Sequence, residues 1–118
     1  MKKILIVEDD AIAAVSLQME VKRWGHECHT LSSGEAAIQW ATKERPDVIL
    51  MDVNLGGVKD GVEIALEIDA LFRCPILFLS GYPKSEIDSR YDANLPFQYL
   101  SKPINRPLLK SMVDELKD

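Results

Sequence analysis

The sequence is poor in cysteine, and it contains no long apolar run. Its two cysteines, Cys28 and Cys74, do not have the spacing of a metal-binding motif. Reduced thiols with a packing role are the simplest interpretation, and they favour a cytoplasmic location. No apolar run approaches the roughly 20 residues of a membrane-spanning helix. The run from Ile4 to Val7 is also too short for a signal peptide, so we expect no interaction with a membrane.

Positive charge is scarce as well. The chain has 14 Lys and Arg residues against 19 Asp and Glu residues, a formal net charge of -5. Because proteins bind nucleic acid largely by neutralising phosphates with Lys and Arg, this balance argues against direct nucleic-acid binding. The hydrophobic content of 47% is that of an ordinary globular protein. The 118 residues suit one compact domain, which we place at residues 1–118.

A run of four large apolar residues that ends in a carboxylate is the strongest feature of the chain. Val48 to Met51 leads directly into Asp52. Such a run, with Pro46 before it and a glycine pair after it, predicts a strand buried on both faces in the middle of a parallel sheet. Open α/β sheets bind ligands at the carboxyl ends of their strands. A charge at that position is costly unless a cation or a hydrogen-bond donor meets it.

Segments with strand character alternate with segments of helical spacing along the whole chain. Strands are predicted over residues 3–7, 26–31, 47–52, 75–80 and 97–101, and helices over 10–24, 32–43, 60–72, 85–91 and 105–116. This alternation predicts an α/β fold of the flavodoxin-like (βα)5 type. Its doubly wound, five-stranded parallel sheet would have the strand order 2-1-3-4-5.

Polar residues mark where four of these helices begin. Asp10 and Asn105 are candidate N-caps. Ser32 with Glu35, and Asp60 with Glu63, fit capping boxes. Apolar residues at helical spacing mark the faces expected to be buried. They are Ile12, Val15 and Met19 together with Ala14, Leu17, Val21 and Trp24 in the first helix, and Leu108, Leu109, Met112, Val113 and Leu116 in the last.

Charged and polar residues follow four of the predicted strands. Glu8 and Asp9 follow the first strand, Asp52 ends the third, Ser80 ends the fourth and Lys102 follows the fifth. Taken alone, each has an ordinary explanation as a helix cap, a turn residue, a polar strand end or a solvated lysine. Parallel strands, however, bring their carboxyl ends to one edge of the sheet, so we expect these residues to lie together.

Three carboxylates at close quarters raise one another's pKa, and a divalent cation relieves the repulsion. Mg²⁺ typically takes one or two carboxylates and keeps its other positions for water and phosphate oxygens. A phosphoryl group on Asp52 would then lie between the metal, Lys102 and the hydroxyl of Ser80, the neutralising surroundings that phosphoryl transfer requires.

With these motifs the sequence resembles the receiver domain of two-component response regulators, the chemotaxis regulators among them. The resemblance covers essentially the whole chain, and it includes Lys102-Pro103 and the aromatic Tyr99. It implies that Mg²⁺ is coordinated by Asp9 and Asp52, by Glu8 mainly through water, and by the backbone carbonyl of Asn54.

The resemblance also implies a role for each phosphoryl-binding residue. Asp52 would be the phosphoacceptor for a phosphohistidine on a sensor histidine kinase or a histidine phosphotransfer protein. Ser80 would hydrogen-bond the phosphoryl group, and Lys102, before a cis bond to Pro103, would pair with it. Movement of Ser80 would let Tyr99 turn inward and change the surface of the fourth helix, fifth strand and fifth helix.

The implied protein is a signalling switch and not an enzyme, apart from its own phosphorylation and autodephosphorylation. The sequence does not identify the output partner or output domain, and it leaves open whether the protein forms a homodimer. Three alternative interpretations place the chain in other classes of protein. A non-phosphorylated interaction module would not need the acid pair. A phosphatase would need a second acid where Asn54 stands. A flavin protein would need a phosphate-binding loop after the first strand, where acids lie instead.

Some positions depart from the family pattern. Gly56 replaces the usual proline after the phosphoacceptor, and the following glycine, Gly61, comes one residue late. This predicts a longer, more flexible loop from Asn54 to Asp60. The Gly-Ala that commonly precedes the last strand is missing, which suggests a short or mobile fourth helix. Tyr82 stands where the family tunes dephosphorylation, and its ring would screen a phosphoryl group from water.

Overall fold

The computed structural model describes residues 1–116, so the last two residues of the predicted domain lie outside the described part. Strands and helices alternate from the first element to the last. They are β1 (Lys3–Val7), α1 (Ala11–Arg23), β2 (Glu27–Leu31), α2 (Gly34–Glu44), β3 (Val48–Asp52), α3 (Gly61–Leu71), β4 (Ile76–Ser80), α4 (Lys84–Asp88), β5 (Phe97–Ser101) and α5 (Arg106–Glu115).

The five strands form one parallel sheet in the order β2-β1-β3-β4-β5. This confirms the predicted fold class and strand order. All five residues of β3 and of β4 are buried, as expected for central strands covered on both faces. The edge strand β2 alternates exposed and half-buried residues, which agrees with its more polar sequence.

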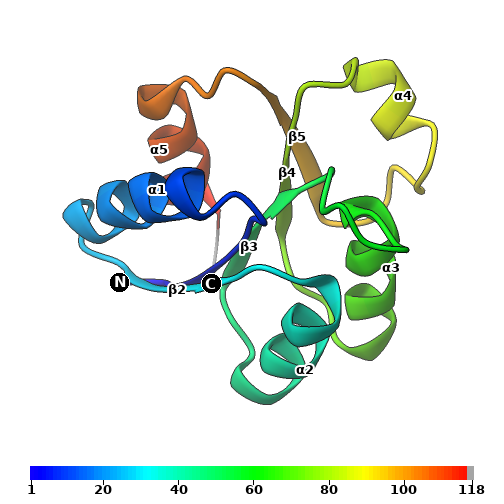
Figure 1. Cartoon of the computed structure of the whole chain (residues 1–118), viewed down its shortest axis with the longest axis horizontal. Coiled ribbons are helices and arrows are strands. Elements are labelled where there is room, and N and C mark those ends of the chain that lie inside the picture. The colour runs from blue at the N-terminus through cyan, green and yellow to red at the C-terminus, as the bar shows by residue number, and fades with distance from the viewer. Residues whose placement is uncertain (117–118) are drawn as a thin grey trace.

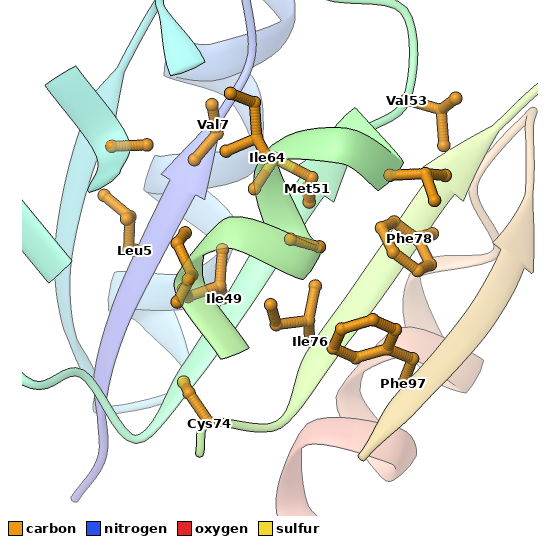
Figure 2. Packing of buried hydrophobic residues seen from close by; sticks show 14 of the residues in the cluster. Leu5, Val7, Ile49, Met51, Val53, Ile64, Cys74, Ile76, Phe78 and Phe97 are labelled. Atoms are coloured by element: carbon orange, nitrogen blue, oxygen red, sulfur yellow. The ribbon is translucent and has the colours of Figure 1, made fainter. Parts of the chain in front are cut away.

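Helices cover both faces of the sheet (Figure 1). One core layer packs α1 and α5 onto the sheet through Leu17, Val21, Leu109 and Val113. The other packs α2 and α3 through residues such as Ile64, and it includes Ile87 of α4. Figure 2 shows this second layer, in which Ile64 lies over the side chains of the central strands. The two core layers hold the five strands in position, and they therefore also determine where the carboxyl ends of the strands lie.

Two predictions about helix ends are wrong. The N-cap of α2 is Ser33 and not Ser32, because the hydroxyl of Ser33 accepts a hydrogen bond from the backbone N–H of Ala36. Helix α4 ends at Asp88 and not at Tyr91. Tyr91 is instead half-buried against the core, with its ring centroid 5.7 Å from that of Phe78. The other predicted caps, Asp10, Asn105 and the Asp60–Glu63 capping box, are confirmed.

The sequence also predicted too wide a buried face on two helices. Ile12, Val15 and Met19 of α1 are exposed, Ile12 at 83%. Leu108 of α5 is exposed as well. A helix against a sheet buries only one stripe, and in α1 that stripe is the row of Ala14, Leu17 and Val21. Within the part of the chain that the structure describes, every helix is too short or too polar to cross a bilayer.

Candidate functional site

The candidate site lies where β1, β3, β4 and β5 end. Asp52 and Ser80 are the last residues of β3 and β4, and both are buried. Glu8 directly follows β1 and is also buried, whereas Asp9 beside it is exposed. Lys102 directly follows β5. The parallel register of the strands therefore brings these five predicted site residues to one edge of the sheet.

Three carboxylates form the acidic half of the site. One oxygen from each of Glu8, Asp9 and Asp52 lies within 4.8 Å of the other two. Burial is the main cause that raises the pKa of Glu8 to about 7, and repulsion by Asp52 adds to it, although a hydrogen bond from the Asp10 N–H opposes the shift. The cluster is thus a place where a proton or a cation is needed.

Lys102 forms the basic half of the site. Its Nζ lies 3.2 Å from Oδ1 of Asp52 and 3.8 Å from a carboxylate oxygen of Glu8. Its backbone N–H donates to the carbonyl of Ser80 at 2.8 Å, and its bond to Pro103 is cis. One ammonium group faces several acids here, so it cannot neutralise the cluster alone.

Asn54 and its loop lie next to Asp52. The backbone N–H of Asn54 donates to Oδ1 of Asp52 at 3.1 Å. Gly56 has a φ of +70°, and a Cβ at this position would lie 3.1 Å from Oδ2 of Asp9. The loop thus passes close to the acid pair. Hard carboxylate oxygens in such a group are donors that suit Mg²⁺. Glu8, Asp9 and Asp52 are the residues that could hold it, and the Asn54 carbonyl as a further ligand stays a prediction.

Ser80 and Tyr99 meet at the loop that follows β4. The Ser80 hydroxyl accepts a hydrogen bond from the Tyr82 N–H at 2.9 Å. The Tyr99 hydroxyl donates to the carbonyl of Tyr82. A hollow of about 220 Å³ opens beside these groups, and Asp52, Asn54, Ser80, Tyr82 and Lys102 line it with Gly81. It has room for a small anionic group next to the Asp52 carboxylate.

Sequence reasoning missed two residues that shape this site. Gly61 packs against β3 so closely that a Cβ there would lie 2.2 Å from the carbonyl oxygen of Asp52. Arg90 forms an ion pair with Asp60, the N-cap of α3. The glycine was noted only for its late position. No sequence signal pointed to Arg90, because its partner is 30 residues away.

A family model and a curated relative match this chain. The family model of the response regulator receiver domain matches residues 4–114. The transcriptional regulatory protein AfsQ1 of Streptomyces coelicolor is 35% identical over 80 residues, which are 68% of this chain and 35% of that protein. The chain therefore matches about a third of the length of this relative.

Solved structures agree with the fold over almost the full chain. The receiver domain of a modulated diguanylate cyclase from Desulfovibrio desulfuricans G20 has a TM-score of 0.85 and 31% identity, covering 98% of this chain and 93% of that one. The chemotaxis protein CheY4 of Vibrio cholerae has a TM-score of 0.86 and 27% identity, with 99% of both chains covered.

A third structural neighbour contains a bound metal ion. The receiver domain of a sensor histidine kinase from Pseudomonas aeruginosa PAO1, with a magnesium ion coordinated in its active-site cleft, has a TM-score of 0.84 and 28% identity. The match covers 98% of this chain and 96% of that one. From the family match over nearly all of its length, and from the fold that carries it, this chain belongs to the response regulator receiver domain family.

Proposed function

We propose that residues 1–118 form a phosphoacceptor domain that takes a phosphoryl group from a phosphohistidine onto Asp52. The observation that carries the proposal is the position of the Asp52 carboxylate. It is buried, it lines a hollow, and it lies 3.2 Å from an ammonium group and within an acidic cluster that suits a cation. A nucleophile in such surroundings gains from neutralisation of the phosphoryl oxygens as the transfer proceeds.

In the proposed step an Oδ atom of Asp52 attacks phosphorus. The P–N bond to the donor imidazole breaks, a P–O bond to Asp52 forms, and the imidazole nitrogen keeps the bonding pair and takes up a proton. Lys102 pairs with the incoming phosphoryl oxygens, and Ser80 donates its hydroxyl hydrogen to one of them. A Mg²⁺ ion held by Glu8, Asp9, Asp52 and the Asn54 carbonyl would supply further positive charge.

The signal would leave the site through Ser80. Its hydroxyl is held by the Tyr82 N–H, and the Tyr82 carbonyl is held by Tyr99. A phosphoryl group that attracts Ser80 would disturb both hydrogen bonds. We infer that phosphorylation shifts an existing equilibrium between two arrangements of the β4–α4 loop and Tyr99. A downstream protein or output domain would read the surface of α4, β5 and α5.

The test is phosphorylation by a small-molecule donor. The protein is incubated with acetyl phosphate and Mg²⁺, and its intact mass is measured. We expect the mass to increase by one phosphoryl group in the wild type. We expect no increase when EDTA is present, and none in Asp52→Asn. Asp92→Asn, which alters an exposed carboxylate outside the site, is the matched control and should be phosphorylated normally. An undiminished gain in Asp52→Asn, or none in the wild type, would refute the proposal.

A further inference from the structure

Helix α4 is attached to the rest of the molecule by few contacts. It has five residues, and its N-cap position is Pro83, which makes no side-chain cap. Ile87 anchors it in the core, and the ring of Tyr91 packs on Phe78 and Phe97. The segment from Gly81 to Pro96 otherwise exposes most of its side chains. Any further tie, meaning a contact between this segment and the rest of the fold, therefore contributes a large share of its attachment.

The ion pair between Arg90 and Asp60 is such a tie. The two guanidinium nitrogens of Arg90 lie 2.6 and 3.0 Å from the two carboxylate oxygens of Asp60, so the contact is bidentate. Asp60 also accepts the backbone N–H of Glu63, whose side chain returns to the Asp60 N–H. Because this capping box already orients the carboxylate, little conformational entropy is lost when Arg90 binds it.

Asp60 in turn is fixed to the backbone of the phosphoacceptor. The next residue, Gly61, donates its N–H to the carbonyl of Val53 at 2.7 Å and packs against the carbonyl of Asp52. The start of α3 and the end of β3 thus form one directly connected piece. Arg90 connects this piece to the α4 segment, which begins just after Ser80.

The ion pair lines a second hollow. It has a volume of about 230 Å³, and its lining includes Asn54, Tyr82, Asp60 and Arg90. Asn54 and Tyr82 also line the hollow beside Asp52. Asn54 lies in the β3–α3 loop, which Asp60 ends, and Tyr82 lies in the β4–α4 loop, at the other end of α4 from Arg90. The pair is therefore placed to set how far these loops stand apart.

We propose that Arg90 is a positioning residue that, by binding Asp60, fixes the gap between Asn54 and Tyr82 through which water reaches a phosphoryl group on Asp52. This inference rests on the proposed function. In the hydrolysis that it controls, a water oxygen bonds to phosphorus and the P–O bond to Asp52 breaks. The products are the Asp52 carboxylate, hydrogen phosphate and one proton.

The test compares the lifetime of the phosphorylated protein in four variants. Arg90→Gln removes the guanidinium, and Asp60→Asn removes the charge while keeping a residue that caps helices well. We expect each to shorten the phosphoprotein half-life by about two- to five-fold, the factor expected of a well-formed, partly exposed ion pair. The double variant should be no shorter-lived than either single one, because both remove the same interaction.

Lys84→Gln is the matched control. It removes an ion pair with Asp88 within α4 and leaves the Arg90–Asp60 pair in place, so the half-life should stay near that of the wild type. Amide hydrogen exchange of the unphosphorylated, metal-free protein gives a second readout. Exchange over residues 81–95 should be faster in Arg90→Gln than in Lys84→Gln.

The outcomes separate this inference from the proposed function. If the wild type is phosphorylated and Arg90→Gln has the same half-life and the same exchange rates, the positioning role is refuted and the phosphoacceptor function stands. Additive losses in the double variant, or an equal loss in Lys84→Gln, would also refute it. A wild type that takes up no phosphoryl group would overturn both.

Discussion

The segments around the site differ in how firmly they are built. We call the segments that follow β1 and β3, with α1 and α3, the first wall, and the segment that follows β4, with α4, the second wall. On one wall, α1 has 13 residues with Asp10 as a side-chain cap, and α3 has 11 residues with a complete capping box. On the other wall, α4 has five residues and no side-chain cap. The first wall carries the carboxylates, and the second joins Ser80 to Tyr99 on β5. The acidic centre is thus held rigidly, and the residues proposed to transmit the signal lie beside the less stable wall.

This difference has a physical basis in local stability. Segments with few buried apolar contacts open at a lower free energy than core helices do. Helix α3 buries Val62, Ile64, Ala65 and Ile68, whereas α4 buries only Ile87 among its five residues. A switch needs two arrangements separated by a small free energy. The second wall can provide these two arrangements while the cluster that would bind the phosphoryl group keeps its structure.

The largest contrast is expected between two buried isoleucines. Ile68→Ala in α3 should lower the free energy of unfolding by about 3 kcal/mol, since it leaves a cavity in the core layer that contains α2 and α3. Ile87→Ala in α4 should lower it by only about 1 kcal/mol, because α4 can detach without unfolding the sheet. Urea denaturation measures both values. Equal losses would show that α4 unfolds only together with the whole domain.

Two glycines at the edge of the site give the next contrast. Gly61→Ala would place a methyl group 2.2 Å from the Asp52 carbonyl and 2.8 Å from the Val53 Cα. We expect a loss of about 2 kcal/mol, because the backbone itself must shift, and slower phosphorylation of Asp52. Gly81→Ala meets no atom within 4 Å, so its stability should change by less than about 0.5 kcal/mol. Thermal unfolding and acetyl phosphate uptake measure these effects, and similar losses at both sites would contradict the contrast.

The last contrast is a pH dependence that belongs to the first wall. The pKa of Glu8 rises from 4.5 to about 7 on folding, chiefly through burial. Between these values the native state holds a proton that the unfolded state has released. The contribution of Glu8 to stability is therefore complete below pH 4.5 and is lost as the pH rises through 7.

Urea denaturation of the metal-free protein at pH 5 and pH 8 tests this effect. The wild type should lose more stability over this range than Glu8→Gln, which cannot titrate at that position. Added Mg²⁺ should restore stability at pH 8 more than at pH 5, because ionised Glu8 favours the cation and because ligands stabilise the state that binds them. An identical pH dependence in the two proteins would contradict the assignment.

Much of the fold could be predicted from the sequence because its signals are local. The apolar run before Asp52, with Pro46 before it and a glycine pair after it, indicates a central strand, and the Asp60–Glu63 capping box needs only four residues. The alternation of strands and helices limits the topology to a few choices, and the right-handed crossover narrows them further. Expected site residues could be named for the same reason, since parallel strands bring their carboxyl ends to one edge.

Local patterns were enough to predict that carboxylates, a hydroxyl and a lysine meet at one edge of a five-stranded parallel sheet, since alternating strands and helices imply parallel strands. Which apolar row of α1 is buried, where α4 ends and whether Arg90 reaches Asp60 are evident from the folded chain alone. Each of these depends on contacts between segments that are distant in the chain. Such contacts are set by packing geometry, and no local pattern of residues specifies them.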